Sequence, residues 1–283
     1  MTSSPSGGTR GIGSGIASVL AEEGYDLLLT YNTDKISADK FAHSLTDKHG
    51  DLKVDCVGGD ISLCSTRDEI FDIFDKNEDS RLEVVVHNAG QYVGITSTNC
   101  DSIKAKRIQF GDGSLLNDNG QVNFDTMHYY QKMYGDAWVD ICERSLVRMK
   151  DGPGTIIGIS SPGVCAHLYG PDSSYSMPGS GKSLMEYSAR IYAMKAAERG
   201  INVNIIVPGA TFTDAWRRLA KSYGMDNEGE IIERVVEDRI PMKRQTTPQD
   251  IGNLVKFLSS STGRMLTGQV LALEGGLHLR AWQ

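Results

Sequence analysis

The stretch Ser6-Gly7-Gly8-Thr9-Arg10-Gly11-Ile12-Gly13 runs directly into a helical pattern over residues 14–22. Its glycines permit a tight turn, let backbone N–H groups approach a pyrophosphate, and let the helix pack closely on a sheet. The positive end of the helix dipole then faces the phosphates. The stretch therefore predicts a turn and helix that bind the phosphates of a dinucleotide.

Apolar segments alternate with longer amphipathic segments along the rest of the chain. The short segments rich in Leu, Ile and Val, which we predict to be strands, are residues 26–30, 53–57, 82–87, 155–160, 202–207 and 269–273. The amphipathic segments, which we predict to be helices, include residues 13–23, 68–75, 124–149, 182–199 and 248–258. This alternation is typical of a parallel sheet with helices on both faces. We therefore predict an α/β fold, a single doubly wound Rossmann-type domain over residues 1–283.

The composition argues against several classes of function. Lys and Arg total 29 against 36 Asp and Glu, a net charge of −7, which disfavours nucleic acid or an anionic membrane as a partner. No apolar run is long enough to span a bilayer. Without a signal peptide, the five dispersed cysteines indicate a cytoplasmic protein with reduced thiols. Since neither an HxxxH nor a CxxC pattern occurs, we expect no metal site.

Two segments are longer than the alternation of strands and helices requires. Residues 97–123 are polar and contain glycines, and residues 211–247 carry two short helical patterns. Long loops at the carboxyl ends of parallel strands usually shape a ligand pocket. We predict a substrate lid at residues 211–240, whereas residues 97–123 are equally consistent with a surface insertion.

Motifs downstream of the glycine turn follow an order that is found in one large enzyme family. They are Asp60-Ile61, Asn88-Ala89-Gly90, Ser160-Ser161, a Tyr/Lys pair, Pro208-Gly209, Pro241-Met242-Lys243-Arg244, Leu266-Thr267-Gly268-Gln269 and Glu274-Gly275-Gly276. With the spacing Gly7-x3-Gly11-x-Gly13, this set resembles the short-chain dehydrogenase/reductase family over nearly the whole chain. The resemblance implies a nicotinamide cofactor, a small-molecule substrate and a homodimer or homotetramer.

The family has a buried central strand before its first glycine, and here only residues 1–6 are available for it. That segment is polar, and Pro5 cannot donate a hydrogen bond to a central ladder. Loss of a central strand would cost several kcal/mol, which is comparable to the net stability of a domain. We therefore expect either a truncated or misassigned start at Met1 or a short first strand that the fold tolerates.

Charge at the end of the second strand predicts which cofactor is used. NAD-selective relatives have an acid there that binds the ribose hydroxyls, but here the first acid is Asp34. Arg10 in the glycine turn and Lys35 supply positive charge, which favours a 2′-phosphate and hence NADP(H). The resemblance assigns the cofactor to Gly7, Thr9, Arg10, Gly11, Ile12, Gly13, Asn32, Asp60, Ile61, Asn88, Ala89, Gly90, Lys182, Pro208, Gly209 and Thr213.

The predicted catalytic residues depart from the commonest family pattern. Tyr-x3-Lys is absent because Pro178 stands four residues before Lys182, and the nearest upstream tyrosine is Tyr175. This Tyr-x6-Lys spacing is similar to that of the enoyl-acyl-carrier-protein reductases. The resemblance makes Tyr175 the proton donor, Lys182 the group that binds the ribose and lowers the tyrosine pKa, and Ser161 a hydrogen-bond donor to the substrate oxygen.

Three alternatives remain open at this stage. Tyr169 could replace Tyr175 as proton donor, and Ser160 could replace Ser161. Tyr134 stands roughly where the family often has an asparagine that holds a proton-relay water, so that the relay would be altered or absent.

We predict an NADPH-dependent reductase of a ketone or conjugated C=C in a small or acyl-type molecule. The rival hypothesis is a non-redox member that uses the cofactor pocket as a scaffold, or for isomerisation or cyclisation.

Overall fold

The computed structural model describes residues 2–77, 81–90, 116, 119–149, 152–164, 175, 177–214, 217 and 229–280. Within these residues a seven-stranded sheet has the order β3-β2-β1-β4-β5-β6-β7, and every neighbouring pair is parallel. The strands are β1 Thr2–Ser6, β2 Asp26–Tyr31, β3 Val54–Gly58, β4 Leu82–His87, β5 Gly154–Ile159, β6 Ile201–Pro208 and β7 Val270–Leu273.

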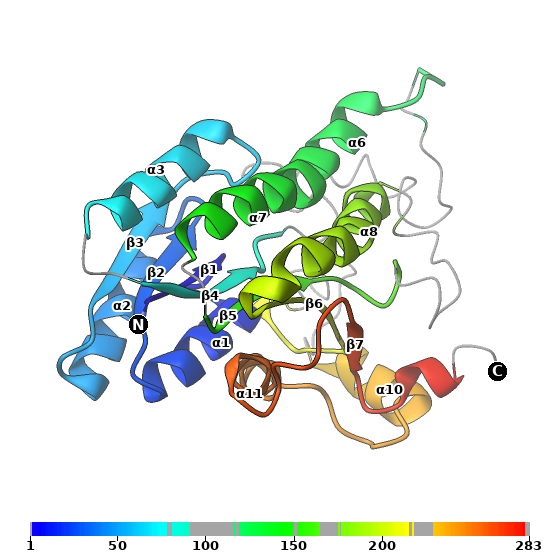
Figure 1. Ribbon diagram of the computed structural model, residues 1–283. Helices are drawn as coiled ribbons and strands as arrows, with labels where there is room; N and C mark the ends of the chain where they lie inside the picture. Colours follow the sequence, from blue (N-terminus) through cyan, green and yellow to red (C-terminus); the bar gives the residue numbers. More distant parts are fainter. Residues whose placement is uncertain are drawn as a thin grey trace.

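Helices cover both faces of this sheet (Figure 1). Buried side chains of α1 Gly11–Glu22, α2 Lys35–His49 and α11 Pro248–Ser259 pack on one face. Those of α3 Cys64–Asp75, α7 Ala137–Arg148 and α8 Pro178–Ala196 pack on the other. The prediction of a doubly wound, Rossmann-type α/β fold is therefore confirmed.

The first strand is short, and it lies in the middle of the sheet. β1 pairs with β4 along its whole length, with Pro5 opposite Val86, whereas its pairing with β2 is limited to Thr2 and Ser3. Pro5 thus lies beyond the register with β2, so the missing proton on its nitrogen costs no bond on that side. A short first strand, one of the two alternatives that the sequence left open, is present between β2 and β4.

The helices differ from the sequence prediction in four places, one of which is α3, where the helix begins at Cys64 rather than at Asp68. α2 was not among the predicted helices, and the predicted helix over residues 124–149 is divided into α6 Phe124–Tyr130, a π-helix η1 Gln131–Asp136, and α7. α8 begins earlier than predicted, with Pro178 in its first turn, where the missing N–H costs nothing. Short 3₁₀ helices follow at η3 Ala197–Arg199 and η4 Leu277–Arg280.

Most of residues 97–123 and much of the predicted lid at 211–240 lie outside the described residues. In the described part of that segment, α10 Glu230–Arg239 packs through Ile232 against Ala210 and Ile240.

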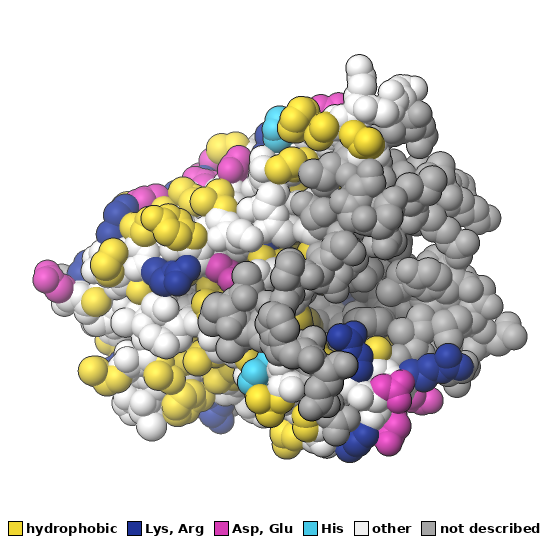
Figure 2. Space-filling view, turned by 90° about the vertical axis from the view of Figure 1, so that its right-hand side faces the viewer, with side chains coloured by type: hydrophobic (Ala, Val, Ile, Leu, Met, Phe, Trp, Pro, Cys, Tyr) yellow, Lys and Arg dark blue, Asp and Glu magenta, His cyan; other side chains and the backbone are white. Residues whose placement is uncertain are grey.

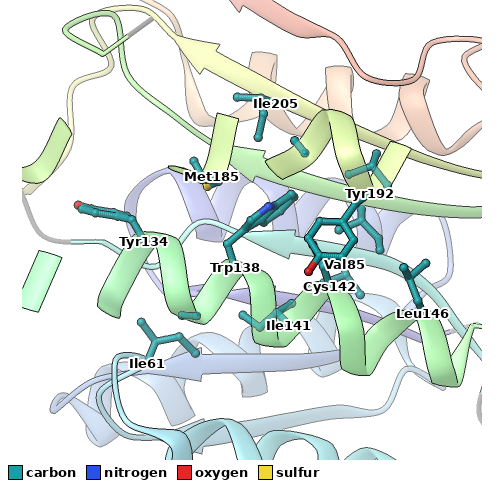
Figure 3. Close-up of a cluster of buried hydrophobic side chains, with 14 of the residues drawn as sticks. Ile61, Val85, Tyr134, Trp138, Ile141, Cys142, Leu146, Met185, Tyr192 and Ile205 are labelled. Carbon is teal, nitrogen blue, oxygen red and sulfur yellow. The ribbon is translucent and has the colours of Figure 1, made fainter. Parts of the chain in front are cut away.

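The larger apolar cluster lies between the sheet, α7 and α8 (Figure 3). Trp138 is completely buried in it, and Ile141, Cys142 and Leu146 follow along the same helix. No described helix is long and apolar enough to cross a membrane, and no cluster of three potential metal ligands occurs among the described residues. On the described part of the face in Figure 2, Lys and Arg side chains lie among Asp and Glu side chains.

Candidate cofactor and active site

A cleft of about 280 Å³ opens at the carboxyl ends of β1 to β4. The order of the strands reverses between β1 and β4, and this is where doubly wound sheets bind their ligands. The predicted cofactor residues that line the cleft are Gly7, Thr9, Arg10, Gly11, Ile12, Asn32, Asp60, Ile61, Asn88, Ala89, Gly90 and Thr213. The remaining four, Gly13, Lys182, Pro208 and Gly209, lie outside this lining.

The glycine turn is held between β2 and β4. Gly7 has a positive φ of 64°, and its N–H donates to Thr30 Oγ1 at 2.6 Å. Asn88 Nδ2 donates to Gly7 O at 3.1 Å, and a Cβ at Gly13 would collide with this same oxygen. Gly13 therefore lets α1 approach the turn, although it does not itself face the cleft.

The N-terminus of α1 carries no side-chain cap, because its N-cap residue is Arg10 and no side-chain hydrogen bond is made there. Uncapped amides at a helix N-terminus are suited to bind phosphate oxygens. Thr213 closes the turn from the β6 side: its methyl group would lie 3.4 Å from a Cβ at Gly11. The turn thus combines the positive end of a helix with a wall of small side chains at Gly11 and Thr213.

The rim beyond β2 carries both charges. Arg10 and Asp34 both line the cleft, and Arg10 helps to lower the pKa of the Asp34 carboxyl. The main cause of that lowering is the hydrogen bond from Ser37 N to Asp34 Oδ1, at 3.0 Å, by which Asp34 caps α2. Lys35, the second predicted cation, bonds Asp39 at 2.7 Å and does not line the cleft. Among the residues that line the cleft, Arg10 is therefore the one that supplies positive charge to this rim.

Asp60 is held on both of its carboxylate oxygens. Ser62 N donates to Oδ1 at 2.9 Å, and the hydroxyl of Tyr129 donates to Oδ2 at 2.9 Å. Burial and the Asp60 charge raise the pKa of Tyr129. Sequence reasoning missed Tyr129, because nothing in the sequence of α6 indicates that this tyrosine contacts Asp60, which follows β3. The other lining residues that it did not assign are Thr30, Tyr31, Thr33, Asp34, Ser37, Gly59, Met133 and Asp214.

The predicted catalytic lysine lies where β5 ends against α8. Lys182 is buried, and its Nζ donates to Ile159 O at 3.0 Å. Burial lowers the pKa of Lys182 to about 8, against the opposing charge of Glu186. Glu186, one turn further along α8, accepts a hydrogen bond from the hydroxyl of Ser160. These two bonds join the end of β5 to the first turns of α8.

Ser161 and Tyr175 flank this junction. Ser161 directly follows Ser160 and is 7% exposed. The ring of Tyr175 lies over Gly163, so that a Cβ added at Gly163 would overlap the ring. A Cβ added at Gly179, in α8, would lie 3.7 Å from the Cβ of Tyr175. Tyr175 is thus located between the loop after β5 and the start of α8. Tyr169, the alternative proton donor, lies outside the described residues.

The Pro208-Gly209 motif ends β6 beside β7. Gly209 N donates to Leu273 O at 2.9 Å, and a Cβ at Gly209 would lie 2.7 Å from the Cα of Glu274. Glu274 in turn accepts hydrogen bonds from Gly276 N and His278 N. The motif therefore fixes the chain that leads to Thr213, rather than lining the cleft.

Comparison with known proteins places these features in a wider group. The sequence model described as "Enoyl-(Acyl carrier protein) reductase" matches residues 7–109 and 124–278. The hydroxynaphthalene reductase-like protein Arp2 of Metarhizium brunneum is 30% identical over 95% of this chain and 92% of its own length. The NADPH-dependent aldehyde reductase 2, chloroplastic, of Arabidopsis thaliana is 27% identical over 96% of this chain and 92% of its own.

A solved structure has the same fold. The L-sorbose reductase of Gluconobacter frateurii, in complex with NADPH and L-sorbose, superposes with a TM-score of 0.79 at 21% identity. The match covers 100% of this chain and 97% of that one. The two proteins therefore share the same fold.

Proposed function

Since the chain belongs to the short-chain dehydrogenase/reductase family, we propose that it is an NADPH-dependent reductase of a ketone or conjugated C=C in a small or acyl-type molecule. The observation that supports this proposal is the junction of β5 and α8, where buried Lys182 bonds the end of the strand that Ser161 closely follows. Tyr175 packs against Gly163 and Gly179, which flank the same junction. Family relatives named as reductases support the redox assignment, and the aldehyde reductase among them supports a carbonyl acceptor.

The cleft fits a dinucleotide in shape and in donor chemistry. Glycines leave the space that a Cβ would fill at the turn, and the uncapped N-terminus of α1 offers amide protons. The glycine turn would hold the pyrophosphate, and Asp60 and Ile61 would flank the adenine. Arg10 would pair with the 2′-phosphate, which is why we propose NADPH rather than NADH. Asn88, Ala89 and Gly90 would line the path towards the nicotinamide, and Thr213 would bind its carboxamide.

NADPH, when bound, supplies a hydride to the substrate. The hydride leaves negative charge on the carbonyl or enolate oxygen, and Tyr175 would donate a proton or hydrogen bond to that oxygen. Lys182 would hold the ribose and, through its charge, lower the pKa of the tyrosine. Ser161 would donate a second hydrogen bond to the same oxygen and stabilise the charge that develops there.

The experiment that tests the reductase follows the nicotinamide absorbance of NADPH with a panel of ketones, aldehydes and enones. We expect NADPH to be oxidised only when a substrate is present. Lys182→Ala should abolish this oxidation, because the substitution should weaken both cofactor binding and turnover. Tight NADPH binding without oxidation by any panel member would favour the non-redox hypothesis instead. NADH in parallel separates the cofactor assignment from the reaction assignment.

We also propose a homodimer or homotetramer built on the outer faces of α7 and α8. Val147 is 83% exposed and Met194 is 75% exposed, and Tyr187 on the same helix as Met194 is 62% exposed. Such large exposed apolar side chains favour burial against a second copy. Light scattering after gel filtration measures the mass, and Met194→Glu should lower it if this face is the interface.

A further inference from the structure

The buried ammonium of Lys182 lies over an aromatic ring. Its Nζ is 4.6 Å from the centroid of Tyr134, a tyrosine that is 4% exposed. At this distance the ring face attracts a cation, and the attraction is stronger when both groups are removed from water. The proposed mechanism uses Lys182 but gives no role to the ring beneath it.

The π-helix η1 determines where this ring lies. Tyr134 belongs to η1, and the carbonyl of Met133 beside it accepts a hydrogen bond at 3.1 Å from Nε2 of His87, the last residue of β4. π-helical turns inside α-helices often occur at functional sites. The ring also stacks parallel to Tyr130, with centroids 6.2 Å apart. Tyr134 is therefore fixed from the sheet on one side and from its own helix on the other.

The hydroxyl edge of the ring packs against Gly90, which lines the candidate cofactor cleft. A Cβ at Gly90 would lie 2.7 Å from the hydroxyl oxygen of Tyr134, so the two residues pack directly together. In Figure 3 the hydroxyl points away from Trp138, the next aromatic residue of the helix. Tyr134 thus fills the space between the lysine and a turn that lines the cleft.

We propose that Tyr134 is the positioning residue for Lys182, and that its ring face holds the ammonium charged and in place for the ribose and the proton donor. This role rests on the proposed function, because it acts through Lys182. Burial disfavours the charged lysine and lowers its pKa to about 8, and the charge of Glu186 opposes that lowering. The face of the Tyr134 ring also favours the charged form. A side chain of similar volume without a π face would lose this compensation.

The test measures the titration of Lys182 directly, by lysine-selective ¹⁵N NMR assigned with Lys182→Arg. In Tyr134→Leu the pKa of Lys182 should fall by about half a unit or more, and the NADPH dissociation constant should rise about threefold to tenfold. Tyr134→Phe keeps the ring face and should restore both values. An unchanged or raised lysine pKa in Tyr134→Leu would overturn the assignment.

A fluorinated series covers the case in which Tyr134→Leu does not fold. Phenylalanine with zero, one and three ring fluorines at position 134 keeps the shape while weakening the negative face, so the pKa of Lys182 should fall in steps. A series without a trend contradicts the proposal. The matched control is Tyr192→Leu. The ring centroid of Tyr192 lies 5.2 Å from Nζ of Lys195 on the same helix, so this substitution should leave the pKa of Lys182 unaffected. If none of the ketones, aldehydes and enones in the panel supports oxidation of NADPH, the proposed function fails. The titration of Lys182 still decides the role of the ring in that case.

Discussion

The hydroxyl of Ser160 donates its hydrogen bond to Oε1 of Glu186, so the first of the two consecutive serines after β5 is bonded within the protein. Ser160 is 2% exposed and Glu186 is 8% exposed, so this hydrogen bond helps to satisfy a buried carboxylate. Because a hydroxyl has one proton, Ser160 cannot donate to Glu186 and to a substrate oxygen at once. This relationship favours Ser161 as the donor to the substrate.

Alanine substitutions should separate the two serines. Ser161→Ala should lower turnover about tenfold or more, since it removes one donor to the developing oxyanion, and should leave stability unchanged. Ser160→Ala should lower the free energy of unfolding by about 1–3 kcal/mol, because buried Glu186 loses this hydrogen bond. Steady-state kinetics and urea unfolding of both variants measure these effects. The reverse pattern would assign the catalytic role to Ser160.

Tyr175→Phe tests the proton donor. The change removes only a hydroxyl, so NADPH affinity should hold while turnover falls by about 10²–10⁴, the usual contribution of a positioned acid. The loss should be smaller with an enone, because solvent can later protonate the carbon of the enolate. Full activity on every substrate would transfer the role to Tyr169, and Tyr169→Phe is then the deciding variant.

Arg10 and Asp34 together should determine cofactor preference. NADPH should bind at least about tenfold tighter than NADH, which corresponds to about 1.4 kcal/mol, and Arg10→Ala should remove most of that difference with little change for NADH. Asp34→Asn should act in the opposite direction, because it removes a carboxylate beside Arg10 while an asparagine still caps α2. Fluorescence titration with both nucleotides measures this, and equal affinities in the unsubstituted protein would contradict the assignment.

The parts of the fold that follow from local pattern were predictable. The apolar runs located β2 to β7 within one or two residues, because a strand that is buried on both faces is apolar along its length. β1 was harder to predict: its polar residues form a strand because β2 and β4 flank it. α2 has only three buried residues, so its apolar periodicity is weak.

The part of the site that depends on tertiary contacts was not predictable. The glycine turn and the order of the motifs located most of the cleft lining, since those residues directly follow strands. The bond between Tyr129 and Asp60, and the ring beneath Lys182, join residues far apart in the sequence. A π-helix also shifts the face on which Tyr134 lies, and the periodicity of 3.6 residues gives no sign of this.

The acid stability of the protein should depend on His87. This residue is completely buried at the end of β4, and burial lowers its pKa to about 4 from 6.5. The unfolded chain therefore binds more protons than the folded one between pH 6.5 and about 4. The free energy of unfolding should accordingly fall as the pH decreases through that window, by up to about 3 kcal/mol.

His87→Gln isolates this contribution, because an amide can donate to Met133 O as the imidazole does but does not titrate over this range. Urea unfolding at several pH values between 7 and 4 should give a shallower fall for the variant than for the unsubstituted protein. His128→Gln, at an exposed position of α6, is the matched control and should keep the full slope. If His87→Gln keeps the same slope, carboxylates rather than this histidine cause the loss of stability in acid.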